Sequence, residues 1–260
     1  MYLEKAKRIL DKEYQIQRAK ADKKGLILIE EKIVHSYQVL GAGNMILKNE
    51  KIYEKCSMDE IDLLKATVLL HDLGRFQEGV TPNIDHGVHG ANLLRNDDDF
   101  KQNKVYLAVK HHGHLIEALY DDEEYKALSE DEKSEVRKYI FLVRDADKIA
   151  NFYLLIRSFQ KMDNLFFHPD RFDGTLKATK AVHEAFMAHK SINKKDVKNV
   201  ADQTLMVMAC VYDLNYKASF EFLDKLNVMK ILMDNCSKHL EEPLQNVYKR
   251  EIIDYIKERV

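Results

Sequence analysis

The amino-acid sequence predicts an all-α fold, and three observations lead to this prediction. The chain of 260 residues holds only three prolines and nine glycines, the residue types that most often interrupt helices. Leucine, lysine, glutamate and alanine, which have high helix propensities, are abundant instead. Ser57 and Ser129 each stand three residues before a glutamate, which is the pattern of a capping box at the start of a helix.

The expected helices follow one another with short connections. Apolar residues recur at helical spacing along most of the chain, and Pro243 fits the first turn of a helix. The expected helices span approximately residues 2–23, 25–49, 58–72, 86–95, 101–112, 130–162, 175–190, 194–215, 217–238 and 243–258.

Three segments between the expected helices are predicted to be connections. Residues 76–85 contain Gly79 and Pro82 and form a candidate substrate loop, and residues 121–124 form a solvated acidic connection. The aromatic residues of segment 163–174 either line a substrate cleft or fill the core below a connection. These aromatic residues are Phe166, Phe167 and Phe172.

Charge and cysteine content restrict the possible partners. The net charge of −2 gives no general attraction to nucleic acid or to an anionic membrane, so neither partner is expected. No apolar stretch approaches the length of a membrane span, and the N-terminus has no apolar signal core. Cys56, Cys210 and Cys236 match neither a zinc nor a disulfide pattern, so a cytoplasmic location is expected. Nothing in the sequence indicates an oligomeric state.

The clearest chemical signal lies at the end of the third expected helix. An apolar run carries His71 and Asp72 toward the interior, where a carboxylate is costly unless it is paired or bound to a metal. The adjacent imidazole favours a metal site, and the structural alternative is a buried His–Asp hydrogen bond. Gly74 is expected to end the helix in the left-handed conformation. Arg75 would then lie just outside the helix, within reach of a phosphate.

Further nitrogen and oxygen ligands occur in the same part of the chain. Seven of the eleven histidines lie between residues 35 and 114, and together with the late aspartates they suffice for one or two transition metals. Adjacent side chains point about 100° apart on a helix, so either His111 or His112 could be the nearer ligand. We expect His89 and His114 to lie outside the ligand set. The seven histidines are His35, His71, His86, His89, His111, His112 and His114.

The late aspartates lie in the segment Arg144-Asp145-Ala146-Asp147. Their side chains diverge by about 200° on a regular helix, so only one should face the metals. Either Asp145 or Asp147 could be that residue, and the other would then lie at the surface or behind the ligands. Arg144 is expected to be a solvated charge.

These motifs resemble those of the HD-domain superfamily of metal-dependent phosphohydrolases. The resemblance covers approximately residues 27–160 and rests on His35 in Val-His-Ser-Tyr, on the His71-Asp72 doublet and on Asp147 in Asp-Ala-Asp-Lys. The segment His86-Gly-Val-His-Gly-Ala resembles the additional His-x-x-x-Gly-Ala element of the two-metal branch, and His111-His112-Gly113 resembles its second additional element.

The resemblance implies an HD-domain helical bundle with additional C-terminal helices. Residues 1–26 would form an N-terminal helix, residues 27–162 the HD metal-binding core, and residues 163–260 a helical extension packed on the core within a single compact domain. One ion would be bound by His35, His71, Asp72 and Asp147. A second ion would be bound by His86 and by one or both of His111 and His112.

The implied activity is hydrolysis of a phosphomonoester or phosphodiester, with a nucleotide as the expected substrate. One or two ions such as Mn, Fe, Co, Ni or Zn would activate a hydroxide, and Asp72 would bridge two ions. Arg75 would neutralise phosphate charge, although the family often has lysine there and the two side chains differ in geometry.

Two alternatives stay open at this stage. A minor branch of the superfamily consists of di-iron oxygenases with a similar ligand set, and a regulatory ligand-binding module could keep a vestigial metal site. The HD-GYP phosphodiesterase branch fits poorly, because His114-Leu-Ile-Glu follows Gly113 where that branch continues with Gly-Tyr-Pro.

Overall fold

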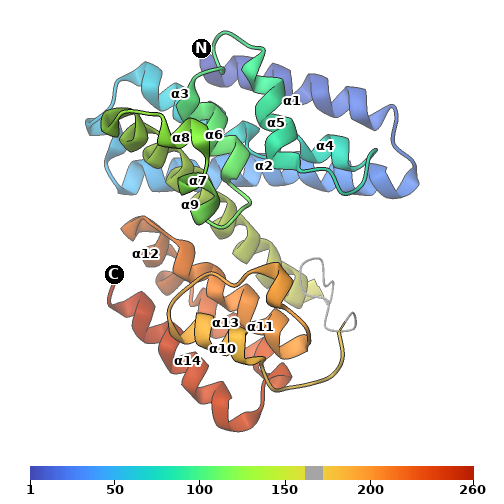
Figure 1. The fold of residues 1–260 in the computed structure, drawn as a ribbon, viewed down its shortest axis with the longest axis vertical. Coiled ribbons are helices and arrows are strands. Elements are labelled where there is room, and N and C mark those ends of the chain that lie inside the picture. The colour runs from blue at the N-terminus through green and yellow to red at the C-terminus, as the bar shows by residue number, and fades with distance from the viewer. Residues whose placement is uncertain (162–171) are drawn as a thin grey trace. The chain divides into compact units, whose positions relative to one another are not determined.

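The structure, a computed structural model, describes residues 1–161 and 172–260 and consists of helices joined by turns and loops (Figure 1). Side chains are described up to residue 157 in the first of these ranges. Within the described residues, the β-structure is limited to an isolated bridge between Asp173 and Asn199. The all-α prediction is confirmed. No helix among the described residues is long and apolar enough to span a lipid bilayer.

The chain divides into two compact units, residues 1–147 and residues 148–260. The division falls inside the longest helix, α9 (Glu130–Lys161), so the helix begins in the first unit and continues into the second. The boundaries expected from sequence, at residues 26 and 162, and the packing of the extension on the core stay predictions.

The first unit contains the long helices α1 and α2, the start of α9 and a series of shorter helices. The remaining helices of this unit precede α9 in the chain. Their bounds are α1 (Tyr2–Arg18), α2 (Lys23–Asn49), η1 (Ile52–Glu54), α3 (Met58–Leu70), α4 (Arg75–Glu78), α5 (His86–Arg95), α6 (Asn103–His111), α7 (Glu117–Tyr120) and α8 (Glu123–Lys126).

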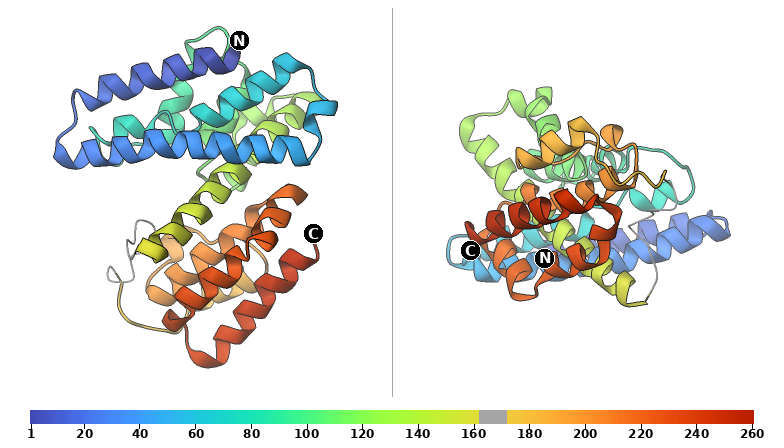
Figure 2. Two further views of the ribbon diagram at one scale, coloured as in Figure 1. Left: turned by 180° about the vertical axis from the view of Figure 1, so that it is seen from behind. Right: turned by 90° about the horizontal axis from the view of Figure 1, so that it is seen from below.

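Long helices pack side by side to form the core of the first unit. α1 lies along α3, with α2 beside both, and α5 packs on α6 (Figure 2). Buried apolar side chains such as Leu10, Leu64 and Leu107 fill the spaces between these helices. Burying each such side chain stabilises the fold by about 2 kcal/mol relative to exposure. The packed helices therefore form a fixed frame for the polar side chains at their ends.

The end of α3 differs from the sequence prediction. The helix ends at Leu70 and not at Asp72, and the prediction of a left-handed Gly74 is wrong, because its φ is −72°. Glycine is required here by close packing on α5. A Cβ atom at this position would lie 2.1 Å from the carbonyl oxygen of His86, which is far inside van der Waals contact. Gly74 thus allows the end of α3 to approach the start of α5.

Two predicted connections contain short helices. The short helix α4 (Arg75–Glu78) extends into segment 76–85, and segment 121–124 contains the start of α8. Asp122 caps α8 by accepting hydrogen bonds from the backbone N–H groups of Glu124 and Tyr125. The expected helix over residues 86–95 is confirmed by α5, with the Asp85 side chain as its N-terminal cap.

The second unit is a bundle of shorter helices. Asn227, with φ of 50°, separates two helices where the sequence predicted a single one. Phe152 and Leu155 of α9 belong to the core of this unit, and Phe172 packs against it, whereas Phe166 and Phe167 lie outside the described residues. The elements are α10 (Lys180–Met187), η3 (Lys194–Asp196), α11 (Val200–Ala209), η4 (Cys210–Asp213), α12 (Lys217–Lys225), α13 (Val228–Cys236), η5 (Ser237–His239) and α14 (Glu242–Lys257).

Candidate metal centre

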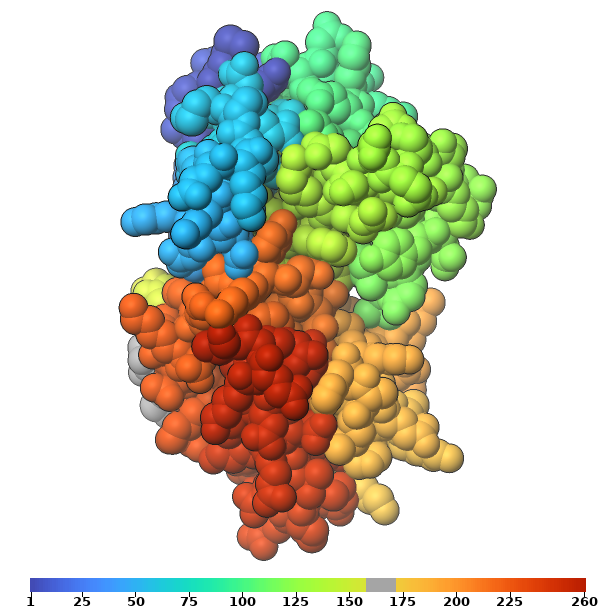
Figure 3. All heavy atoms as spheres, turned by 90° about the vertical axis from the view of Figure 1, so that its left-hand side faces the viewer, coloured from blue at the N-terminus to red at the C-terminus, as the bar shows by residue number. Residues whose placement is uncertain are grey.

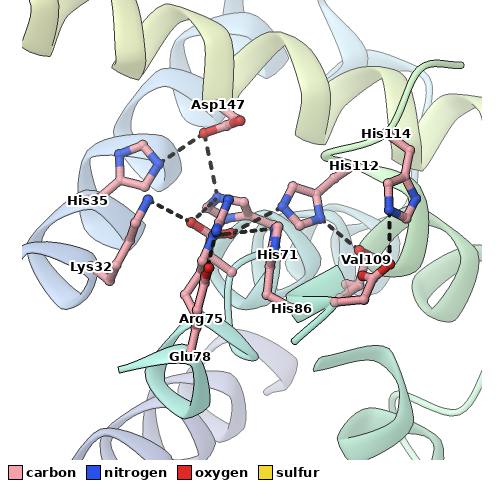
Figure 4. A network of polar contacts seen from close by, with 12 residues as sticks. Lys32, His35, His71, Arg75, Glu78, His86, Val109, His112, His114 and Asp147 are labelled. Carbon is pink, nitrogen blue, oxygen red and sulfur yellow. Dashed lines mark hydrogen bonds and ion pairs between the residues drawn. The ribbon is translucent and has the colours of Figure 1, made fainter. Parts of the chain in front are cut away.

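Histidine and aspartate side chains from five helices of the first unit converge on one cluster (Figure 4). α2 carries His35, and α9 carries Asp147. His71 and Asp72 follow the end of α3, His86 begins α5, and His112 follows the end of α6. The residues of this cluster, hereafter the metal cluster, are His35, His71, Asp72, His86, His112 and Asp147.

Two of the histidines are oriented by the same local contact. The Nδ1 atom of His71 lies 2.9 Å from the carbonyl oxygen of Val68, and that of His112 lies 2.7 Å from the carbonyl oxygen of Val109. A carbonyl oxygen only accepts hydrogen bonds, so each Nδ1 carries the proton and donates it. When such a ring is neutral, its Nε2 atom presents a lone pair to the cluster, as in a typical metal-binding histidine.

The Nε2 atoms face carboxylates. His112 Nε2 lies 3.1 Å from Oδ1 of Asp72, while His71 Nε2 lies 3.7 Å from one oxygen of Asp72 and 3.7 Å from one oxygen of Asp147. His35 Nε2 is 2.9 Å from the same Asp147 oxygen. His71 therefore belongs to two sets of potential ligands, in each of which the ligand atoms lie within 4.8 Å of one another. The sets are His35, His71 and Asp147, and His71, Asp72 and His112.

His86 extends the second set. Its Nε2 atom lies 3.6 Å from Oδ1 of Asp72, and its ring is 5.1 Å from that of His112 between centroids. The Nε2 atoms of His71 and His86 are both buried and have no hydrogen-bond partner among the described residues. Buried polar atoms in folded proteins are nearly always satisfied, so these two nitrogens indicate a missing partner.

Two cations also contact Asp72. Lys32 Nζ lies 3.2 Å from one of its oxygens, and Arg75 Nε lies 3.4 Å from the other. Arg75 is held in addition by Glu78, with Nη1 and Oε2 2.5 Å apart. Burial would raise the pKa of Asp72, but Lys32 and His71 outweigh it and hold that pKa well below its usual value. Asp72 is therefore an anion in the folded protein.

The pKa shifts of most other metal-cluster residues agree with a cation site. Burial would raise the pKa of Asp147, but its contacts with His35 and His71 hold it well below the usual value. Burial lowers the pKa of His35 and lowers that of His86 to about 3. Burial also opposes protonation of His71, but Asp72, Asp147 and the carbonyl group of Val68 together outweigh it and raise the pKa. The shifts of His35, His86 and the two aspartates favour neutral imidazole and ionised carboxylate, the states in which these side chains bind metals, whereas a metal ion at His71 would have to displace the proton.

These observations agree with the donor set of a transition-metal site. A lone pair on a neutral imidazole that faces a carboxylate is repelled by it unless a proton or a metal ion lies between them. Imidazole nitrogen with carboxylate oxygen suits Mn, Fe, Co, Ni or Zn. The residues of the metal cluster thus fit one or two such ions.

The family comparison agrees with this geometry. Residues 33–151 match the family model of the HD domain, and this range includes all the residues of the metal cluster. Residues 33–151 therefore form a domain of the HD-domain superfamily. HD-domain proteins bind divalent metals, and the superfamily is of a metal-dependent hydrolase type, although some of its members are not enzymes. Neither a search of curated proteins nor a search of solved structures found a match.

The structure distinguishes between the two adjacent histidines of this HD domain. His112 faces Asp72, whereas His111 is directed to Asp122, with Nε2 2.7 Å from Oδ2. His111 was expected as a possible ligand, but it lies in neither of the two ligand sets. Burial lowers the pKa of His111. The neighbouring His114 contacts Asp85 and lies outside the ligand sets, as expected.

Two cations of the HD domain were not anticipated in their observed roles. Arg144 was predicted to be solvated, but it is buried, and its Nη1 atom lies 3.1, 3.0 and 2.5 Å from the carbonyl oxygens of His111, His112 and His114. It therefore satisfies carbonyl groups at the end of α6, which would otherwise lack donors. Lys32 was not considered a site residue. Its position three residues before His35 on the same helix could have indicated a shared face.

Proposed function

We propose that the protein is a metal-dependent phosphohydrolase that cleaves a phosphomonoester or phosphodiester, with a nucleotide as the expected substrate. The observation that carries this proposal is the position of Asp72. It lies among the metal-cluster histidines and also contacts two cations, Lys32 and Arg75. Potential metal ligands and potential phosphate-binding groups therefore occur in one site.

The proposed ligands form two sets around shared residues. His35, His71, Asp72 and Asp147 would hold one ion, and His86 with His112 would hold a second that shares Asp72. A divalent ion bound there lowers the pKa of a water ligand and so supplies hydroxide near neutral pH. The contacts of His71 and His112 with Val68 and Val109 fix the rings so that Nε2 is the ligand atom.

The cations beside Asp72 would bind the phosphate group. The side chain of Lys32 is 17% exposed and that of Arg75 is 26% exposed, so both reach the surface of the site. Glu78 holds Nη1 of the Arg75 guanidinium and Asp72 faces its Nε, so Nη2 is the end left to contact phosphate oxygens. Fixed positive charges of this kind stabilise the charge that develops on phosphate during transfer.

The first prediction tests this proposal at Asp72. Asp72→Asn keeps the size of the side chain but removes the charge that the two proposed ions would share. We expect metal content to fall and phosphate release to drop by a factor of about 100 or more. The measurement is elemental analysis of the purified protein, followed by phosphate release over a panel of nucleoside mono-, di- and triphosphates and cyclic diesters.

His114→Ala is the matched control, because His114 is a neighbouring histidine outside both ligand sets. Equal loss in both variants would contradict a specific role for Asp72. Bound iron together with substrate-dependent oxygen consumption and no phosphate release would favour the oxygenase alternative. Absence of bound transition metal in the wild-type protein would favour the regulatory module.

A further inference from the structure

A pocket in the first unit is lined by none of the residues of the metal cluster. It has a volume of about 450 Å³, which is in the range of small-molecule sites. Its walls come from α7, α8 and the first turns of α9, a segment that forms the green to yellow-green surface in Figure 3. The lining residues are Tyr120, Tyr125, Lys126, Lys133 and Arg137.

The charge of this pocket is entirely positive. Three of the lining side chains are cations and none is a carboxylate. Arg137 donates a hydrogen bond to the hydroxyl of Tyr125 over 2.8 Å and forms no ion pair with another described residue. An unpaired guanidinium beside lysines is a typical binding arrangement for phosphate.

Both lysines of the pocket are available to a ligand. Each lysine forms an ion pair with a glutamate three residues earlier on its own helix. Lys126 pairs with Glu123 over 2.8 Å, and Lys133 pairs with Glu130 over 2.9 Å. The two glutamates are 87% and 79% exposed. Exposed pairs of this kind contribute only about 0–1 kcal/mol, so an anion of higher charge can replace them.

The tyrosines add a surface for a planar group. Their ring centroids are 5.9 Å apart with an interplanar angle of 50°, and Tyr120 is 42% exposed whereas Tyr125 is 5% exposed. Tyr125 is fixed by Arg137, and the exposed ring of Tyr120 can stack on a base. Cations and an accessible aromatic ring together match the two halves of a nucleotide.

The pocket walls are also fixed in place before any ligand binds. Asp122 caps α8, which carries Tyr125 and Lys126, and its other oxygen contacts Lys110 and His111, each over 2.7 Å. A preformed site loses less entropy on binding than a site that must order itself. We propose that this pocket is a second binding site, distinct from the metal cluster, for a phosphorylated ligand that carries an aromatic base.

The test measures binding of α,β-methylene-ADP, a nucleotide analogue that resists hydrolysis, by titration calorimetry on the full chain. All proteins carry Asp72→Asn, which reduces any contribution from the metal cluster. We expect Lys133→Gln/Arg137→Gln to weaken binding by a factor of about ten or more. Lys101→Gln is the matched control. Lys101 is an exposed lysine of the same unit and forms an ion pair with Asp98, three residues earlier, as Lys133 does with Glu130.

Further variants separate the two halves of the ligand and protect the test from misfolding. Lys126→Gln/Lys133→Gln leaves the contact between Arg137 and Tyr125 intact and should also weaken binding. Tyr120→Leu should weaken binding of the analogue but not that of inorganic phosphate measured in the same way. Absence of binding in the Asp72→Asn protein, or equal affinities of the pocket variants and the Lys101→Gln control, would overturn the proposal.

Discussion

His71 and His112 show how single residues at helix ends become a metal site. Each follows an apolar helix, and each donates from Nδ1 to the carbonyl oxygen three residues earlier. This contact satisfies a carbonyl that the helix leaves without a partner and fixes the ring at the same time. The orientation of each ring is thus fixed locally, and the packing of the helices brings Nε2 of His71 and His112 to Asp72. Lys32 reaches the same carboxylate from α2.

The prediction at the residue scale concerns Lys32. Lys32→Met keeps much of the apolar length of the side chain and removes the charge beside Asp72. If Lys32 binds the phosphate group, kcat/KM for a phosphorylated substrate should fall by a factor of about 10–100 with the metal content unchanged. Steady-state kinetics and elemental analysis provide the two measurements.

Lys48→Met is the control for Lys32, because Lys48 is exposed and lies on the same helix, α2. A purely structural Lys32 would give a different result. The variant would then melt at a lower temperature even in chelator, and the activity per folded molecule would be retained.

At the scale of helices, Glu60 joins three elements that also carry metal-cluster residues. It lies in the first turn of α3, and its two oxygens contact Lys104 of α6 over 2.8 Å and Lys138 of α9 over 2.9 Å. Burial would raise the pKa of Glu60, but the hydrogen bonds from both lysines lower it to about 2. The charged carboxylate therefore stabilises the packing of these helices.

The pH dependence of this contribution has a definite sign. Because the pKa in the folded protein is below the ordinary value of 4.5, the contribution is fully present above 4.5 and is lost as the pH falls toward 2. We expect the destabilisation caused by Glu60→Gln to shrink by about 1 kcal/mol between about pH 7 and about pH 3.5. Urea unfolding of both proteins at the two pH values checks this, and an unchanged difference would show that the carboxylate charge is not responsible.

Local sequence signals predicted several elements, and tertiary contacts decided the rest. The bounds of α5 were predicted from the sequence, and Asp85 caps it. The role of Gly74 could not be predicted, because it depends on the approach of α5 to the end of α3. His111 and His112 are adjacent and chemically identical, so only the position of Asp122 on a later segment distinguishes them. Arg144 looked like a surface charge because its acceptors are backbone carbonyls, which a sequence does not reveal.

At the scale of the whole molecule, the metal cluster and the second helical bundle belong to different compact units. Every residue of the metal cluster lies within residues 1–147, whereas the core of the second unit begins with Phe152 and Leu155 and continues through α10 to α14. The two units share α9, whose residue Asp147 is the last of the first unit. An ion bound by the cluster would therefore connect α2, α3, α6 and α9 within the first unit.

This arrangement predicts that metal removal loosens one unit and not the other. A ligand that binds only the folded state stabilises it, so its removal makes local opening of the connected helices more frequent. With chelator, we expect faster amide hydrogen exchange in the segments around His35, His71 and His112, and unchanged exchange in α11 and α13. Mass spectrometry of exchanged peptides, with and without chelator and after re-addition of the metal, measures this. Equal acceleration in both units would show that the ion supports the whole chain, and no change in the first unit would show that the cluster does not connect its helices.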